Sequence, residues 1–340
     1  MQLEIRSEVW PYATPFRITN YVFTDAEVLV VCLRDDGARG RGEAGGVYLH
    51  GETPATMSGQ IEAVRTRIEA GIDRQGLREI LPPGGARNAL DAALWDLEAK
   101  RLGTPVWKIA GMRPPKALTT TFTVGAGAPD EMARTAVSYR DARAIKLKLT
   151  SDDPATCVAA VRAARPDVWL GVDANQGFTR RSLERVMPHL VEAQVALIEQ
   201  PVPVGADGEL EGLRSPIPIA ADESVRGLAD LGPLAGLYDV VNIKLDKCGG
   251  LTEGLAMARR ARTLGLRVMV GCMSGTSLAM APAFVLGQIC DLVDLDGPTF
   301  LAGDRENPAL YSNGEIWCPD DLWGAGTEQP SPRVRAPSGP

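Results

Sequence analysis

Short apolar stretches recur roughly every 20 to 30 residues from about residue 117 onward, with helix-like segments between them. Eight of these stretches read as β-strands, and they cover residues 118–124, 144–148, 168–173, 195–199, 217–222, 240–244, 267–272 and 292–296. Strands that alternate with helical patterns form parallel βαβ units, and eight such units close into a barrel. This repeat therefore predicts a barrel of the (β/α)8 type.

The segments on either side of the repeat have other patterns. Residues 26–33 form an apolar strand that ends at the turn signal Asp35-Asp36-Gly37, and residues 86–102 have helical periodicity up to Gly103. These patterns are typical of an α+β domain. The predicted divisions are an α+β domain (1–115), the barrel (116–300), a segment that returns to the first domain (301–326) and a flexible tail rich in Pro, Ser and Arg (327–340).

The composition argues against several classes of protein. The 340 residues carry 36 basic and 43 acidic side chains, and the net charge of −7 gives no reason to expect nucleic acid. No apolar run is long enough to span a bilayer, and the charged first ten residues do not read as a signal peptide. Six scattered cysteines without a CxxC pair favour a reduced, cytoplasmic protein, and two histidines leave little material for histidine chemistry.

Charged residues stand where six of the eight predicted strands end. In a barrel these ends meet on one face, where active sites lie. A single acid at a strand end is more often a turn former or a helix cap, but a whole set of charges ending apolar strands costs stability unless it binds something. The set is Lys146, Lys148, Asp173, Glu199, Asp222, Lys244, Asp294 and Asp296.

Three of these acids come from consecutive strands and predict a metal site. Asp173, Glu199 and Asp222 are hard oxygen ligands that would leave coordination positions for water or substrate, as Mg²⁺ prefers. Lys148 and Lys244 lie on opposite sides of an eight-strand ring, with these acids between them. Such an arrangement suits removal of a proton next to a carboxylate, with a metal-stabilised enediolate and return of a proton to the other face.

A lysine base needs a lowered pKa. Lys146 shares one side of its strand with Lys148, and this second charge, together with the dication, should disfavour protonation of Lys148.

The order Lys-x-Lys, Asp-x-Asn, Glu-Gln-Pro, Asp-Glu-Ser and Lys resembles the muconate-lactonizing subgroup of the enolase superfamily. The resemblance runs from Thr14 to Gly324, and residues 241–247, 271–273 and 294–298 look especially like bacterial dipeptide epimerases. It implies a (β/α)7β barrel under an N-terminal α+β capping domain, which the C-terminal segment completes.

The resemblance also implies an activity and a set of roles. The expected enzyme is an isomerase that epimerises a dipeptide, L-Ala-D/L-Glu being one candidate. Lys148 and Lys244 would be the acid/base pair, with Lys146 tuning Lys148, and one Mg²⁺ per subunit would bind the three acids. Asp294 and Asp296 would receive the ammonium group of the dipeptide, as paired carboxylates can. Thr123 is a further candidate substrate contact, and we also expect a homo-oligomer.

One position departs from the relatives that act on Ala-Glu. Those proteins often carry an arginine shortly before a Gly-Glu pair, and here Leu49 occupies that place before Gly51 and Glu52. A side-chain carboxylate would lose its natural partner, although Arg17 is one candidate replacement. The side-chain specificity therefore stays open, and an apolar or mixed dipeptide becomes plausible.

Other functions fit parts of the pattern. A cycloisomerase or an N-acylamino-acid racemase would use the same lysines and metal, but an N-acyl group offers no ammonium to Asp294 and Asp296. A Schiff-base aldolase needs one lysine and no set of three acids. A barrel that binds without catalysis would not need a lysine on each side of the site.

Overall fold

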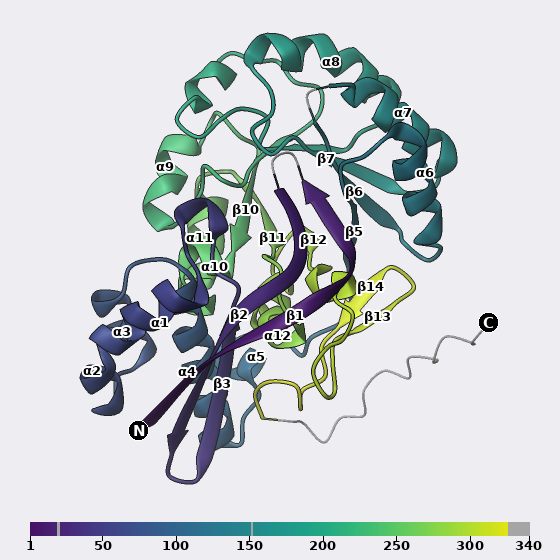
Figure 1. The fold of residues 1–340 in the computed structure, drawn as a ribbon. Coiled ribbons are helices and arrows are strands. Elements are labelled where there is room, and N and C mark those ends of the chain that lie inside the picture. Colours follow the sequence, from purple (N-terminus) through teal and green to yellow (C-terminus); the bar gives the residue numbers. More distant parts are fainter. Residues whose placement is uncertain (19–20, 151, 326–340) are drawn as a thin grey trace, which may run out of the picture.

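The computed structural model describes residues 1–18, 21–150 and 152–325. Its centre is a parallel eight-stranded sheet whose strands follow one another in chain order around a barrel (Figure 1). The strands are β5 (Thr121–Val124), β6 (Ala144–Lys148), β7 (Trp169–Asp173), β8 (Leu197–Glu199), β9 (Ile219–Ala221), β10 (Val240–Lys244), β11 (Arg267–Gly271) and β12 (Leu292–Asp294). All eight predicted strands are present, most of them one to three residues shorter than predicted.

Helices cover the outside of the barrel (Figure 1). They are α6 (Pro129–Ser138), α7 (Pro154–Ala164), α8 (Arg180–Glu192), α9 (Leu231–Leu234), α11 (Leu251–Thr263) and α12 (Ser277–Gly287), with 3-10 turns η2 (Asp207–Leu210) and η3 (Leu228–Asp230). The short helix α10 (Leu245–Cys248) is buried beneath the N-terminal part, and the 3-10 turn η4 (Gly297–Phe300) follows β12. Because β12 leads into η4 instead of a full helix, the predicted (β/α)7β fold is confirmed. None of the helices in the described ranges is long and apolar enough to cross a membrane.

Helix α8 illustrates why these segments are helical. Thr179 precedes it, and its side chain accepts a hydrogen bond from the amide of Ser182, which satisfies one free donor of the first turn. Leu183, Val186 and Leu190 follow at helical spacing and are buried. One face of the helix therefore packs on the barrel while its charged side chains stay in water.

An antiparallel sheet and a group of helices form the N-terminal part. The sheet contains β1 (Gln2–Ile18), β2 (Tyr21–Asp35) and β3 (Ala38–Ala44). The helices are η1 (Tyr48–His50), α1 (Pro54–Ala63), α2 (Arg65–Glu69), α3 (Arg74–Ile80), α4 (Gly85–Leu102) and α5 (Val106–Ile109). Gly42 of β3 must be glycine, because a Cβ there would lie 2.0 Å from the carbonyl oxygen of Ala89 in α4.

The hairpin of β1 and β2 crosses in front of the barrel strands (Figure 1). Phe16 pairs with Phe23 across its two strands, so their side chains share one face of the hairpin. The amide of Ala126, after β5, donates to the carbonyl of Arg17 at 3.0 Å and holds the hairpin against the barrel. This contact places the predicted capping part over the carboxyl ends of the strands.

The barrel closes between β5 and β12 through side chains. No backbone ladder joins these two strands in the described part of the chain. Instead, the hydroxyl of Thr120 accepts from the amide of Leu295 at 2.9 Å, and the carboxylate of Asp296 accepts from the amide of Thr123 at 2.6 Å. The hydroxyl of Thr121 donates to Asp294. We call this set of contacts the closing seam.

The segment after the barrel contacts both parts of the molecule. Strands β13 (Leu310–Ser312) and β14 (Glu315–Trp317) form a small sheet with β4 (Leu118–Thr119). The indole of Trp323 donates to the carbonyl of Ala92 at 3.2 Å, and the amide of Gly324 donates to Asp96 at 2.6 Å. Both partners belong to α4. The division into domains stays a prediction, and the predicted tail 327–340 lies outside the described residues.

A buried ion pair joins three separate segments. Glu43 of β3 is completely buried and accepts from the amide of Thr276, at the start of α12, at 2.7 Å. Arg305 reaches the same carboxylate at 2.6 Å from the C-terminal segment. Burial raises the pKa of Glu43, while Arg305 opposes that rise. A charged Glu43 therefore depends on Arg305.

Replacing Arg305 with alanine should lower the free energy of unfolding by about 3–5 kcal/mol near neutral pH, because it leaves a buried carboxylate unpaired. The loss should shrink as the pH falls, since protonated Glu43 needs no cation and its folded-state pKa lies above the unfolded value. Urea denaturation at several pH values measures this. The control is Arg262→Ala, whose partner Asp291 is exposed, with an expected loss below about 1 kcal/mol. Equal losses in both variants would refute the role of Arg305.

Candidate active site

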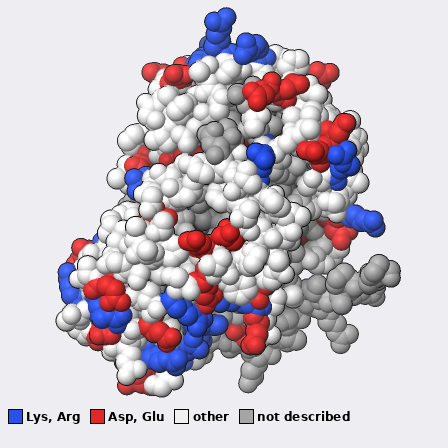
Figure 2. Space-filling view, in the orientation of Figure 1, with Lys and Arg blue, Asp and Glu red and all other residues white. Residues whose placement is uncertain are grey.

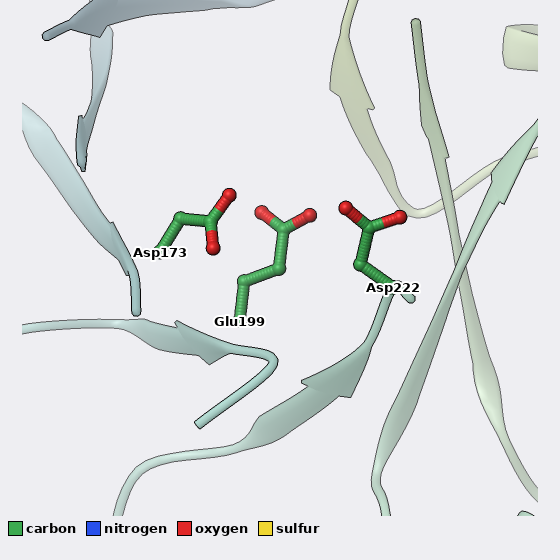
Figure 3. Close-up of side chains that lie close together, drawn as sticks. All are labelled: Asp173, Glu199 and Asp222. Atoms are coloured by element: carbon green, nitrogen blue, oxygen red, sulfur yellow. The ribbon is translucent and has the colours of Figure 1, made fainter. Parts of the chain in front are cut away.

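Three acids meet where three neighbouring strands end. Asp173 ends β7, Glu199 ends β8, and Asp222 follows β9 directly. One carboxylate oxygen from each lies within 4.8 Å of those from the other two. Figure 3 shows the three side chains pointing into the same space from adjacent strands. The prediction that these strand ends converge is confirmed by this geometry.

The donor set fits a hard divalent cation. All three acids are almost completely buried, and oxygen Oε2 of Glu199 has no hydrogen-bond donor among the described residues. The nearest cation to that oxygen is Lys146, 3.3 Å away. Burial raises the pKa of Glu199 to about 7 even though Lys146 opposes it. An oxygen that is buried, aimed at other carboxylates and not hydrogen-bonded is suited to metal coordination.

A lysine stands at each end of this row of acids. Lys148 of β6 contacts Asp173 at 2.6 Å, and Lys244 of β10 contacts Asp222 at 2.7 Å. Strands β6 and β10 are four places apart in the eight-stranded ring, so the two lysines face each other across its mouth. Both line one cavity of about 350 Å³ together with Asp222 and Asn175. A substrate carbon in that cavity has an amine on either side.

The charge of Lys244 is strongly stabilised by its neighbours. Burial alone would lower its pKa, but Asp222 and Glu199 outweigh burial and raise the pKa above the ordinary value. Lys244 in turn affects Asp222: burial alone would raise the pKa of Asp222, but Lys244 and Lys247 outweigh burial and lower it. The acids and the lysines therefore form one coupled electrostatic unit.

Lys146 contacts one predicted metal ligand and one predicted substrate ligand. Its ammonium contacts Asp294 of β12, and Glu199 lies 3.3 Å away. Burial opposes its charge, but these two acids outweigh burial and raise the pKa of Lys146. The sequence predicted only an influence on Lys148. The structure adds a positive charge held between a predicted metal ligand and a predicted substrate ligand.

Asp294 and Asp296 lie in the closing seam. The sequence analysis placed both on the last strand. This placement is wrong for Asp296, because β12 ends at Asp294 and Asp296 is the residue that precedes η4. Burial, together with Asp294, raises the pKa of Asp296 to about 7. Neither acid, nor Thr123, is among the described residues that line the cavity. Their contact with substrate stays a prediction.

Two buried side chains that sequence reasoning missed support the acids. The amide of Asn242 in β10 donates to Glu199 at 2.6 Å. Lys247 in α10 contacts the carboxylate of Asp222 at 2.5 Å. Asn242 lies two residues before Lys244, so strand alternation could have placed it on the same side. Strand alternation gives no such signal for Lys247, which follows the strand in a short helix, although Lys247 ends the stretch 241–247 that resembles dipeptide epimerases.

Replacing Asn242 with alanine should lower the free energy of unfolding by about 1–3 kcal/mol, because it leaves a buried oxygen of Glu199 without its donor. Metal affinity should fall about 10- to 100-fold, since the ligand loses the partner that orients it. Denaturation curves and metal titration calorimetry measure the two effects separately. Unchanged metal affinity in a folded variant would show that Asn242 does not position Glu199.

Family models match both parts of this architecture. Residues 1–111 match the mandelate racemase/muconate lactonizing enzyme N-terminal domain, and residues 130–329 match the enolase C-terminal domain-like family. The chain therefore belongs to the mandelate racemase/muconate lactonizing enzyme family of the enolase superfamily. The resemblance inferred from the sequence is confirmed.

Among characterised relatives, the chain is 41% identical to the L-Ala-D/L-Glu epimerase of Escherichia coli, covering 92% of this chain and 98% of that one. It is 37% identical to an N-acetyl-D-glutamate racemase of Pseudoalteromonas, covering 87% and 95%.

Solved structures of similar fold include proteins that bind dipeptides. An enolase family member from Agrobacterium tumefaciens with bound sodium and L-Ala-L-Glu has a TM-score of 0.92 and 40% identity, covering 95% of this chain and 99% of that one. A dipeptide epimerase from Methylococcus capsulatus, complexed with Mg and L-Arg-D-Lys, has a TM-score of 0.85 and 31% identity, covering 93% and 96%.

Proposed function

We propose that this protein is a magnesium-dependent dipeptide epimerase that inverts the α-carbon next to the C-terminal carboxylate. The observation that carries the proposal is the placement of Lys148 and Lys244 on opposite sides of one cavity, with three acids between them. Relatives that are named dipeptide epimerases support it over nearly the whole length of the chain. Their named substrates differ in side chain, so the class of reaction is proposed first.

Asp173, Glu199 and Asp222 would hold the magnesium ion. A bound dication would neutralise these acids and draw electron density from a substrate carboxylate, so that the α-proton becomes easier to remove. Lys148 takes the proton on one face of the α-carbon, and Lys244 delivers a proton to the other face. Each lysine serves as base for one enantiomer and as acid for the other, as two-base epimerisation requires. Lys146 supplies a fixed charge beside Lys148.

The N-terminus of the substrate distinguishes this function from its closest alternative. Asp294 and Asp296, with Thr123 beside them, would bind the ammonium group of a dipeptide. The relative that is named an N-acetyl-D-glutamate racemase favours the alternative reading, in which an N-acyl group takes the place of that ammonium. The two functions use the same lysines, so only the N-terminus separates them.

N-acetylation of the dipeptide should lower kcat/KM of the wild type by about one to two orders of magnitude, because a charge-assisted contact contributes roughly 1.5–3 kcal/mol. The additional penalty should be much smaller in Asp296→Asn, which has already lost this contact. Steady-state kinetics with free and acetylated substrates measure both. If the wild type turned over both forms equally well, the racemase function would replace the epimerase.

The direct test of the proposed reaction is proton exchange. A dipeptide library incubated with the protein and Mg²⁺ in deuterium oxide should gain one deuterium at the α-carbon of the C-terminal residue, detected by mass spectrometry. Exchange should stop after exhaustive chelation and return with added Mg²⁺. A library without any exchange would overturn the proposed function and favour a barrel that binds without catalysis.

We further propose that the protein works in the cytoplasm. All six cysteines are unpaired in the structure, which supports a reducing compartment such as the cytoplasm. We also propose a homo-oligomer, which sedimentation velocity of the purified protein would measure.

A further inference from the structure

The cavity above the two lysines is charged at the barrel and mainly apolar toward the N-terminal part. Its floor carries Lys148, Lys244 and Asp222 at the carboxyl ends of the barrel strands. Its upper wall comes from the N-terminal part and, apart from three acids, is mainly apolar: Phe16, Ile18, Phe23, Val47, Tyr48 and Leu49. A substituent on a carbon held between the lysines and directed away from the barrel therefore enters an apolar space.

Phe23 and Tyr48 of that wall belong to an aromatic cluster whose third member, Tyr21, lies outside the cavity lining. The ring of Tyr48, in η1, lies 5.4 Å from that of Phe23 and 4.6 Å from that of Tyr21, both edge to face. Tyr21 and the neighbouring Leu49 nevertheless remain 43% and 42% exposed. Figure 2 shows that much of the surface over the hairpin is uncharged. Large apolar groups that stay exposed around a cavity mark a surface that a ligand would cover.

The cations of the cavity are already paired. Lys148 contacts Asp173, and Lys244 and Lys247 both contact Asp222. No arginine is among the described residues that line the cavity. An anionic side chain that entered the upper part would therefore find no free partner there.

The charges of the upper wall are negative. They belong to Asp25 and Glu27 of β2 and to Glu52. Glu52 is occupied by the backbone amides of Val47 and Gly85, at 2.8 and 3.2 Å. An entering carboxylate would thus be desolvated beside like charges, which costs binding energy.

We infer that the side chain of the epimerised residue is large and apolar or aromatic, and that Phe23, Tyr48 and Leu49 select it. This inference rests on the proposed function and names its substrate class. The cavity accepts a leucine, methionine or phenylalanine side chain against the rings and rejects a glutamate side chain. Specificity is then set by the N-terminal part, while the barrel performs the proton transfer.

A panel that varies one residue tests the inference on the wild-type protein. L-Ala-L-Leu, L-Ala-L-Phe, L-Ala-L-Glu and L-Ala-L-Lys are compared by α-deuterium exchange, and the first two should have at least about 10-fold higher kcat/KM than the others. A preference for the glutamate dipeptide would overturn the inference and leave the epimerase function intact. A preference for the lysine dipeptide would also overturn it and would point to Asp25 and Glu27. Absence of exchange in all four would instead count against the proposed function.

Two variants locate the selectivity. Leu49→Arg would place a free guanidinium at the rim, and it should raise the ratio of kcat/KM for the glutamate over the leucine dipeptide by at least about 10-fold. Leu102→Arg is the matched control, since Leu102 is 60% exposed and does not line this cavity, and it should leave the ratio unchanged. Phe23→Ala should weaken turnover of L-Ala-L-Phe far more than that of L-Ala-L-Ala. Equal effects on both dipeptides, or an unchanged ratio in Leu49→Arg, would refute the assigned wall.

Discussion

Replacement of Lys244 by alanine should abolish epimerisation, with kcat lowered by about 10²–10⁴-fold or more, while α-proton exchange continues for one enantiomer of the substrate. The reason is geometric: Lys148 remains on the opposite side of the cavity and still reaches one face of the α-carbon. Lys148→Ala should show the mirror preference. Nuclear magnetic resonance in deuterium oxide, with each enantiomer supplied separately, measures exchange apart from inversion.

The control for these variants is Lys108→Ala, because Lys108 is exposed on α5 and far from the cavity lining. It should keep wild-type rates for both enantiomers. Loss of exchange for both enantiomers in both active-site variants, with the folded state preserved, would contradict the assignment of one lysine to each face.

A second large effect is expected when Glu199 becomes glutamine. The amide keeps the shape of the side chain but removes one of three negative ligands. Loss of a residue that only hydrogen-bonds to a metal ligand typically lowers metal affinity about 10- to 100-fold, so loss of the ligand itself should lower it further. Because activity depends on the metal, kcat/KM should fall by at least about 100-fold at a fixed, limiting Mg²⁺ concentration. Titration calorimetry reports binding independently of turnover.

Measuring the free energy of unfolding of the metal-free variant shows whether lost metal binding comes from the missing ligand or from misfolding. The metal-free Glu199→Gln variant should remain folded, with a loss in the free energy of unfolding of at most about 1–3 kcal/mol. The amide oxygen can still accept from Asn242, and Lys146 keeps its contact with Asp294. Asp36→Asn, at a turn where the side chain is 83% exposed, is the control and should change neither binding nor stability. Wild-type metal affinity in Glu199→Gln would remove Glu199 from the site.

The barrel was predictable because its signal is local. Each buried strand is a short apolar run bounded by polar turns, and six of the eight end in charges that the rules of barrel architecture place on one face. The convergence of Asp173, Glu199 and Asp222 follows from that rule alone. The position of Lys148 and Lys244 on opposite sides of the ring, with the three acids between them, follows from counting strands.

What could not be predicted depends on contacts between distant residues. Nothing local to Lys146 indicates that its ammonium reaches Asp294 past the intervening strand β5, or that Asn242 donates to Glu199. Asp296 was assigned to a strand because the alternation with Asp294 looked regular, but the Gly-Pro that follows favours a 3-10 turn there. The ends of elements are set by such tertiary contacts more than by propensity.

The apolar wall was only partly visible in the sequence. The presence of Leu49 instead of an arginine raised the question of side-chain specificity. The sequence did not indicate that the ring of Tyr48, in a loop, would meet those of Tyr21 and Phe23 on a hairpin. Aromatic residues at a turn are common, and their meeting depends on the packing of that hairpin over the barrel.

The closing seam gives this barrel an unusual weak point. In a fully hydrogen-bonded barrel no strand has a free edge, and this protects the sheet from pairing with other chains. Here β5 and β12 satisfy part of their edges with the side chains of Thr120, Thr121, Asp294 and Asp296. A substitution at those positions therefore uncovers an edge of the sheet as well as altering the predicted ammonium site, so it carries a risk of aggregation that the same change elsewhere on the barrel rim does not.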